Sequence, residues 1–572
     1  MFSRKRLAYI LIITLIFSLL FFVFNLDHAF FRSQAVNPFD KYVPTDPLSA
    51  QLDGVADAGY LIVGNPQNDT EKRIKANVLF TLDQLKATSI ETDSLRDTDY
   101  AEDSVIIFVV QDISSASDLQ QLAQAVTDGR RVIFAAGLPM ESTYKYLDPL
   151  WGILERGSLT PVSDITFVGS YFPYESITAS QAYPTSALTV RLNVDAEVLL
   201  KGPEDLPLVW THAYRLGRVA VINGSFLESK LSSGLLVGAV NAVKEYALYP
   251  VLGTKVVVLD AIPPLFDSND DKSFEYYGRS AESFVRDKLW PVLIQKATVL
   301  DLKLTSSFLA IDKLKFDAQN ANQQTFSSIN REILRYGGEI TLAGNHVDLD
   351  PLTQARITQT KTFFEQFFPN YTVRAYTPLY GKIEASQLDL LQTVYSSMKV
   401  LRLLVDGDGI TQSNGDYGIQ NDTVIYPTTT YGYIAEGKQL YTFVSMLTTY
   451  GAISHSFDIN ALFTVPSSES NWNTLNQPFD VLTERFFAKT PWLKSLTISP
   501  AAQKVRDLAD LQVDTSTQTD RMIVACQDLI PGQTFMFYSN KPILSIEGAR
   551  FTRINERYYL IEAESASFTI HY

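Results

Sequence analysis

Runs of hydrophobic residues alternate along the chain with segments whose apolar positions follow a helical repeat. The runs Tyr60–Val63, Val105–Val110 and Arg131–Ala136 are apolar at nearly every position, which is typical of strands buried on both faces. The segment Thr70–Lys86, between the first two, places its apolar residues on one helical face. This alternation predicts a parallel sheet covered by helices.

The first region of this kind spans residues 56–252. It includes a further strand, Arg218–Asn223, and a helix around Leu235–Ala247. We expect an α/β domain of flavodoxin-like or amidotransferase-like type. The region has no G-x-G-x-x-G, no P-loop and no Cys or G-x-S-x-G nucleophile, so we expect it to bind or to scaffold rather than to catalyse.

A second series of strands and helices spans residues 253–470. It opens with Lys255–Leu259 followed by Asp260, an apolar strand that ends in a carboxylate. In (β/α) barrels the catalytic groups lie at such strand ends. The strand candidates that follow predict a closed or partly closed (β/α) barrel. They are Leu302–Leu309, Gly338–Ala343, Tyr371–Tyr376, Val400–Val405, Thr423–Tyr426 and Gly451–Ser456.

The pattern changes again over residues 471–572. Short alternating runs such as Met522–Cys526 and Gln533–Tyr538 are separated by turn residues. This predicts a C-terminal antiparallel β-sandwich. Carbohydrate-binding modules and domains without a ligand share that architecture, so the pattern predicts a fold and not a role.

The N-terminus carries a membrane signal. Arg4, Lys5 and Arg6 precede Leu7–Phe24, which is 18 residues long and has no charge. At 1.5 Å per residue this run would span about 27 Å, close to the ~30 Å hydrocarbon core. We expect an uncleaved transmembrane signal-anchor within residues 1–28 rather than a cleaved signal peptide, whose apolar core is shorter. The flanking charges predict a cytoplasmic N-terminus.

This signal predicts a single-pass protein of the cell membrane, with most of the chain extracytoplasmic and a linker over residues 29–55. The single cysteine, Cys526, excludes an internal disulfide and a cysteine-based zinc site. An exported chain with one cysteine favours a bacterial envelope. The net charge of −15 and the lack of a Lys/Arg cluster beyond the N-terminus argue against nucleic acid as a partner.

Four short motifs follow one another in the second α/β region. They are Leu259-Asp260, the segment 337–346 (GGEITLAGNH), Tyr376-Thr377-Pro378 and Ser454-His455. In this order they resemble polysaccharide deacetylases of the NodB type. The resemblance is closest to an uncharacterised, membrane-anchored bacterial branch associated with exopolysaccharide systems of the Pel type. It implies a NodB-like barrel with an α/β domain before it.

The resemblance also implies roles for single residues. In that family one Asp and two His hold a divalent metal that activates a water. A second Asp takes the proton of this water, and a later His protonates the leaving amine. Asp260 matches the base, His346 one metal ligand and His455 the acid. Ala261 and Leu342 stand where the other ligands belong, and neither side chain can donate a lone pair.

The resemblance therefore implies a degenerate metal site, and we expect no cofactor. A divalent metal such as zinc would bind only if other residues rebuild the site. The carboxylates that could rebuild it are Asp267, Asp270, Asp271, Asp348 and Asp350. The alternative is that these five are solvated loop residues that bind no metal.

Three functions stay open. We first expect a deacetylase-like protein of cell-envelope or exopolysaccharide assembly that is catalytically impaired and binds glycan or a partner. Its cleft would be lined by Tyr376, Tyr380 and Tyr426, which can stack on sugar rings. The second is an active metal-dependent polysaccharide N-deacetylase or other carbohydrate hydrolase, and the third is an assembly scaffold that binds no glycan. The expected partners are polysaccharide, the membrane through the N-terminal helix and, as candidates, exopolysaccharide synthase subunits.

Overall fold

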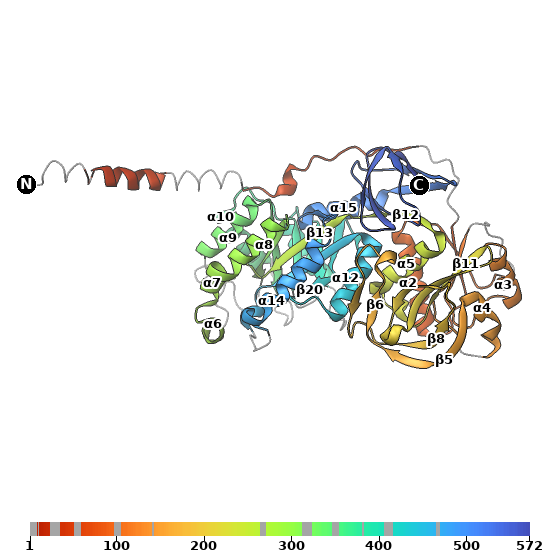
Figure 1. Cartoon of the computed structure of the whole chain (residues 1–572). Coiled ribbons are helices and arrows are strands. Elements are labelled where there is room, and N and C mark those ends of the chain that lie inside the picture. The colour runs from red at the N-terminus through yellow and green to blue at the C-terminus, as the bar shows by residue number, and fades with distance from the viewer. Residues whose placement is uncertain are drawn as a thin grey trace, which may run out of the picture.

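The computed structural model describes most of the chain, and Figure 1 shows how its parts are arranged. The described residues are 9, 11–22, 35–50, 59–95, 104–139, 142–262, 270–311, 323–345, 354–379, 383–404, 416–464 and 470–572. They form a mixed α/β structure in which a mixed sheet, a curved parallel sheet and a β-rich C-terminal region follow one another along the chain.

The first sheet is parallel along one half and antiparallel along the other. Its parallel part has the strand order β2-β1-β3-β4-β11, which is the order of a flavodoxin-like sheet. The antiparallel part continues through β10, β9, β6 and β7, an extension that the sequence pattern did not predict. The elements are β1 (Tyr60–Val63), α2 (Asp69–Gln84), β2 (Ser89–Thr92), β3 (Val105–Phe108), α3 (Leu119–Thr127), β4 (Arg131–Phe134), β6 (Ile165–Phe167), β7 (Ile177–Ala179), β9 (Glu197–Lys201), β10 (Pro207–Tyr214), β11 (Gly217–Ile222) and α5 (Ser233–Lys244).

The second sheet curves into a half-barrel, which corrects the expected (β/α) barrel. Its order is β18-β19-β17-β16-β15-β14-β13-β21-β20, and within the described ranges no hydrogen bonds join the two edge strands. Between these edges, β19 pairs with β17 and leads directly into β20, which pairs with β21. The helix α15 (Ile498–Asp510) packs against both β13 and β19. The strands are β13 (Thr254–Asp260), β14 (Leu304–Ile311), β15 (Glu339–Asn345), β16 (Ala375–Leu379), β17 (Val400–Leu404), β18 (Gly418–Gln420), β19 (Thr423–Thr428), β20 (Thr430–Tyr431) and β21 (Ala452–Asp458).

Helices cover the convex face of the half-barrel. In α9, Phe326, Ile329 and Ile333 are spaced three and four residues apart and are buried, as an amphipathic helix requires. Figure 1 shows α8, α9 and α10 grouped at the end of the molecule opposite α3 and α4 (Asp148–Trp151). The covering helices include α8 (Trp290–Val299), α9 (Gln323–Arg335), α10 (Gln354–Phe367), α11 (Ala385–Val394), α12 (Gly437–Tyr450) and α14 (Trp472–Thr483).

The β-rich C-terminal region consists of two antiparallel sheets around a shared core. In β24, Met522, Val524 and Cys526 are buried while the residues between them are half-buried, which is the period of a strand with one core face. The first sheet has the order β12-β25-β28-β27 and the second β23-β24-β29-β26. The strands are β12 (Tyr246–Val251), β23 (Gln512–Thr517), β24 (Arg521–Gln527), β25 (Thr534–Ser539), β26 (Ser545–Glu547), β27 (Ala549–Arg553), β28 (Tyr558–Ala563) and β29 (Ser567–His571).

The transmembrane helix expected at Leu7–Phe24 is not supported by the structure. Across the described ranges, no helix is both long and apolar enough to cross a membrane. The predicted single-pass anchor and the cell-membrane localisation derived from it are therefore wrong on this finding.

Residues 35–50, within the expected linker, lie against the folded chain. Asn37 is fully buried, and its side-chain amide donates to Glu339 Oε1 and to Tyr371 Oη, both at 3.2 Å. Further along, Leu48 forms an antiparallel bridge with Leu529. This segment therefore joins the half-barrel to the C-terminal region.

Candidate functional site

Two carboxylates end neighbouring strands of the half-barrel. Asp260 is the last residue of β13 and Asp458 the last residue of β21, and they face each other in the parallel ladder. Because the carboxyl ends of parallel strands meet at one edge, these residues mark the mouth of the half-barrel. The connections that follow β13 to β17 at this edge include residues 263–269, 312–322, 346–353, 380–382 and 405–415, which lie outside the described residues.

Arg402 crosses the concave interior of the half-barrel to reach Asp260. It lies on β17, which β16, β15 and β14 separate from β13. Its Nη2 donates to Asp260 Oδ1, its Nε to Thr377 Oγ1 at 2.8 Å and its Nη1 to Thr428 Oγ1 at 2.9 Å. Both members of the ion pair are 1% exposed. The guanidinium therefore holds the Asp260 carboxylate in a fixed orientation inside the protein.

Asp458 carries a carboxyl group with a perturbed pKa. Its Oδ1 accepts hydrogen bonds from the backbone N–H groups of Asn460 and Ala461, at 2.9 and 3.3 Å. Burial and then the charge of Asp260 raise the pKa of Asp458 to about 7, against the lowering effect of these two donors. Asp458 therefore gains or loses its proton near neutral pH, and a group of this kind can take part in proton transfer.

The hydroxyl of Ser307, on the concave face, has no hydrogen-bond partner within the described part of the chain. Ser307 is the neighbour of Asp260 in the ladder, and Tyr426 is the neighbour of Arg402; both are fully buried. The ring of Tyr426 packs 5.0 Å from that of Tyr417. Buried polar groups in folded proteins are normally satisfied by protein, water or ligand. The hydroxyl of Ser307 is therefore a polar group beside the ion pair that a water or a ligand would satisfy.

His455 does not lie in this space. It pairs with Val257 in the ladder, so its side chain points to the convex face, where its ring centroid lies 4.5 Å from that of Phe457. Its Nε2 donates to Gly432 O at 2.9 Å, and its Nδ1 accepts from Thr430 Oγ1 at 2.9 Å. Burial lowers the pKa of His455 to about 3, although the Gly432 carbonyl raises it. In this conformation His455 is a neutral residue of the core.

Leu342 and Tyr376 also belong to the convex face. Asp260 pairs with Ser307 and Ser307 with Thr341, so the next residue, Leu342, points away from the concave interior. Tyr376 is its neighbour on β16. Both are fully buried in the apolar cluster under the helices. The structure therefore brings neither side chain to Asp260.

The remaining predicted residues divide into two groups. Ala261 follows Asp260 with φ +56°, and its N–H donates to Ser307 O at 2.9 Å, which turns the chain at the mouth. His346 and Tyr380 lie outside the described residues. The structure thus gives no contact for either of them.

The divalent metal implied by the deacetylase fold does not fit the described donors. Arg402 binds Asp260, and His455 uses both ring nitrogens within the core. Over the described ranges no group of three or more His, Cys, Asp or Glu could hold a metal ion. The expectation that no cofactor binds stays a prediction, since the matched ligand His346 and the loop residues Asp267, Asp348 and Asp350 lie outside these ranges.

Sequence reasoning missed the partners of Asp260. Arg402 is a single charge within the apolar run Val400–Val405, and a charge in a buried strand requires a partner. Asp458 ends a strand that contains Ser454, His455 and Ser456, so it did not carry the signal of an apolar strand ending in a carboxylate. Ser307, Thr377 and Thr428 carried no signal of their own, because a hydroxyl in a strand is common.

Comparison with known proteins places the chain in a family. A family model matches residues 157–560, more than half of the chain. The chain belongs to the DUF2194 family. That family is described as an uncharacterised protein conserved in bacteria. No curated protein matches the DUF2194 chain.

Solved structures show the fold of the DUF2194 chain. Agd3, described as a novel carbohydrate deacetylase, matches with a TM-score of 0.53 at 8% identity, over 90% of this chain and 98% of Agd3. A ThuA-like protein from Bacteroides uniformis ATCC 8492 matches with a TM-score of 0.27 at 16% identity, over 34% of this chain and 95% of its own. The expected resemblance to polysaccharide deacetylases is thus confirmed at the level of the fold.

Proposed function

We propose that the DUF2194 chain binds a glycan at the mouth of its half-barrel and is impaired as a metal-dependent deacetylase. The observation that carries this proposal is the polar concave interior, where Arg402 fixes Asp260 beside the unpartnered hydroxyl of Ser307. Sugar hydroxyls both donate and accept hydrogen bonds, so they suit a few convergent polar groups at a strand-end mouth. The fold shared with Agd3 supports a carbohydrate as the class of ligand.

Two features support impairment. His455, the matched acid, is buried with both ring nitrogens bonded, so it has no proton to offer at the mouth. The described donors do not form a metal set. Deacetylation by the family's scheme would therefore require residues outside the described ranges.

One observation favours a second function, hydrolysis of a carbohydrate by the two strand-end carboxylates. The pKa of Asp458 is raised to about 7 by burial and by the charge of Asp260, and a general acid works best near its own pKa. In this alternative Asp458 takes the place of His455 as the proton donor. Loss of turnover in Asp458→Asn, with turnover kept in His455→Gln, would support it.

The setting we propose is bacterial exopolysaccharide assembly of the Pel type, with synthase subunits as candidate partners. The resemblance of the motifs supports this setting. The alternative is the third function considered above, an assembly scaffold that binds no glycan. Co-purification with a synthase subunit together with no binding on a glycan array would favour the scaffold.

The test uses the full chain and oligomers of N-acetylglucosamine. We expect binding by isothermal titration calorimetry, at least tenfold weaker in Arg402→Lys, because the compact ammonium group lacks the planar fork whose three nitrogens reach Asp260, Thr377 and Thr428. Arg550→Lys, on β27, is the matched control, because this exposed arginine lies in the C-terminal region and not in the half-barrel. Release of acetate by the wild type that is lost in Asp260→Asn would overturn the proposal that deacetylation is impaired. Absence of binding to the oligomers would overturn the proposal that the chain binds a glycan.

A further inference from the structure

A groove follows the end of α15 and the strand β23, and an apolar pocket opens beside it. The groove has a volume of about 1010 Å³ and the pocket a volume of about 370 Å³. Lys86, Ile419 and Ala509 line both of them, so the two spaces adjoin one another. Neither space is lined by Asp260, Asp458 or their partners, so this surface is separate from the half-barrel mouth.

The wall of the pocket is the surface of an apolar core. Val505 and the rings of Tyr417 and Tyr450 line the pocket and belong to the buried cluster beneath α15. Ile419 differs from them, since it is 39% exposed. It pairs in the ladder with Val424 of the same cluster, so its side chain lies on the face of β18 that covers this core. A bulky apolar side chain placed in the pocket would cover Ile419 and extend the core.

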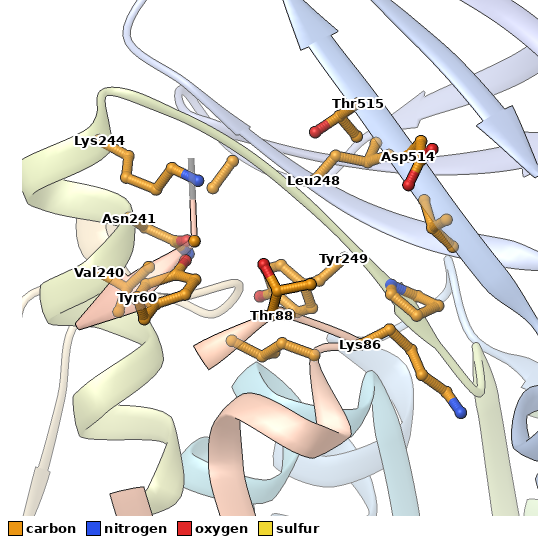
Figure 2. A pocket seen from close by; sticks show the side chains of 16 residues that line it. Tyr60, Lys86, Thr88, Val240, Asn241, Lys244, Leu248, Tyr249, Asp514 and Thr515 are labelled. Carbon is orange, nitrogen blue, oxygen red and sulfur yellow. The ribbon is translucent and has the colours of Figure 1, made fainter. Parts of the chain in front are cut away.

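The groove beside the pocket is negatively charged. Lys86 Nζ donates to Ala509 O at 2.9 Å and Arg506 Nη1 to Asp422 Oδ1 at 2.9 Å, so both cations of the groove are already bound. Figure 2 shows the amino group of Lys86 turned away from the carboxylate of Asp514. Three carboxylates of the groove form no side-chain hydrogen bond or ion pair within the described part of the chain; they are Asp510, Asp514 and Asp528. A cationic partner is therefore complementary to this surface.

The strand β23 borders the groove as the edge of its sheet. Its ladder partner is β24, and among the described residues no backbone hydrogen bonds reach its other side. Gln512, Val513 and Asp514 of this strand line the groove. The free N–H and C=O groups of an edge strand can pair with an extended peptide, whereas a glycan has no backbone amides to continue a ladder. The edge therefore favours a peptide over a sugar polymer.

We propose that this surface binds an extended, basic peptide segment of a partner protein. One bulky apolar side chain of the segment occupies the pocket beside Ile419. Lysine or arginine side chains of the segment pair with Asp510, Asp514 and Asp528, and its backbone pairs with β23. The proposal is independent of glycan binding, because it uses no residue of the half-barrel mouth.

The test measures binding of synthetic peptides to the full chain by fluorescence polarisation. The probe is a labelled peptide with a central leucine flanked by alternating lysine and threonine residues. One comparison peptide carries serine in place of the leucine, and another carries glutamate in place of each lysine. We expect each comparison peptide to bind at least tenfold more weakly than the probe. Ile419→Ser and the double variant Asp510→Asn/Asp528→Asn should each weaken binding of the probe at least tenfold.

Two control variants make the same chemical changes away from the groove. Asp195→Asn/Glu556→Gln removes two exposed negative charges, as the double variant in the groove does. Leu544→Ser replaces an apolar side chain that is 75% exposed and does not line either space. Both controls should bind the probe as tightly as the wild type does.

Several results would overturn the inference. They are equal affinity for the lysine and glutamate peptides, no binding of the probe to the wild type, and an equal loss of affinity in the groove variants and their controls. If a glucosamine oligomer competed with the probe and bound more tightly, the surface would be a site for a cationic glycan, and the peptide proposal would fail. All substituted side chains are exposed, and unchanged melting temperatures would confirm that the variants fold.

Discussion

At the residue scale, the buried ion pair of Asp260 and Arg402 is the main electrostatic feature of the half-barrel. Arg402→Met would leave the Asp260 carboxylate buried without its cation, which should lower the free energy of unfolding by ~3–5 kcal/mol. The double variant with Asp260→Asn should recover part of this loss, because it buries no charge. Urea unfolding of both variants measures the difference. If Arg402→Met alone were as stable as the wild type, the ion pair would not contribute to stability.

Asp458 gives a prediction of pH dependence. Its pKa of about 7 in the folded protein lies above the unfolded value of ~3.9, so the native chain binds more protons between these pH values. The contribution of Asp458 to stability is therefore present at low pH and is lost as pH rises toward 7. Asp458→Asn keeps the acceptor but cannot ionise, so its melting temperature relative to wild type should rise over this window. Parallel curves for the two proteins would contradict the raised pKa.

The sequence could predict part of the site and not the rest, for physical reasons. Asp260 was visible as a carboxylate at the end of an apolar strand. The sequence did not show on which face of the sheet the side chains of Leu342, Tyr376 and His455 lie. A shift of one residue in the assumed strand register moves every side chain to the other face. Arg402 was present as a lone charge, but only the curvature of the sheet shows that it reaches β13.

At the element scale, close packing of α5 against α12 joins the first sheet to the half-barrel. A Cβ on Gly234 would lie 2.4 Å from Ser445 O, whereas one on Gly238 would lie 3.1 Å from a side-chain atom of Phe172. Gly234→Ala should therefore lower stability by ~1–3 kcal/mol through overpacking. Gly238→Ala is the matched control and should cost less, because its Cβ meets a side-chain atom at a longer distance and Ala favours the helix. Similar thermal shifts in the two variants would argue against this contact.

The segment 35–50 is a second element with a testable role. Asn37→Ala removes the donors to Glu339 and Tyr371, and burial already raises the pKa of Glu339. We expect a loss of ~1–3 kcal/mol in unfolding free energy. Backbone amides of the segment should also exchange hydrogen faster. Asp46→Ala, an exposed change in the same segment, should alter neither quantity; equal effects would show that Asn37 does not hold the segment.

The hydrophobic pattern predicted most of the helices and strands, but it did not predict how the strands pair in the sheets. The helix expected over Thr70–Lys86 is α2, Asp69–Gln84. It could be predicted because its apolar residues lie on one face that packs against the core. The strand expected at Tyr371–Tyr376 begins later, at Ala375, because Tyr371 and Val373 are buried in the convex cluster without joining the ladder. The antiparallel extension β10-β9-β6-β7 depends on pairing between distant segments, which periodicity within one segment does not encode.

At the scale of the whole molecule, the half-barrel is held by a fixed ion pair between β13 and β17. Asp260 and Arg402 are each 1% exposed, so salt should screen their attraction little. The loss of unfolding free energy in Arg402→Met should therefore stay nearly the same as sodium chloride rises. Urea unfolding at several salt concentrations tests this, and a loss that disappears at high salt would argue against a buried pair.

The central claim is that the polar interior at the half-barrel mouth holds a glycan. The most direct measurement is calorimetric titration of an N-acetylglucosamine oligomer into the wild-type chain and into Arg402→Lys. The account predicts saturable binding to the wild type and at least tenfold weaker binding to the variant, with both proteins folded. Equal affinities, or no binding to the wild type, would contradict it.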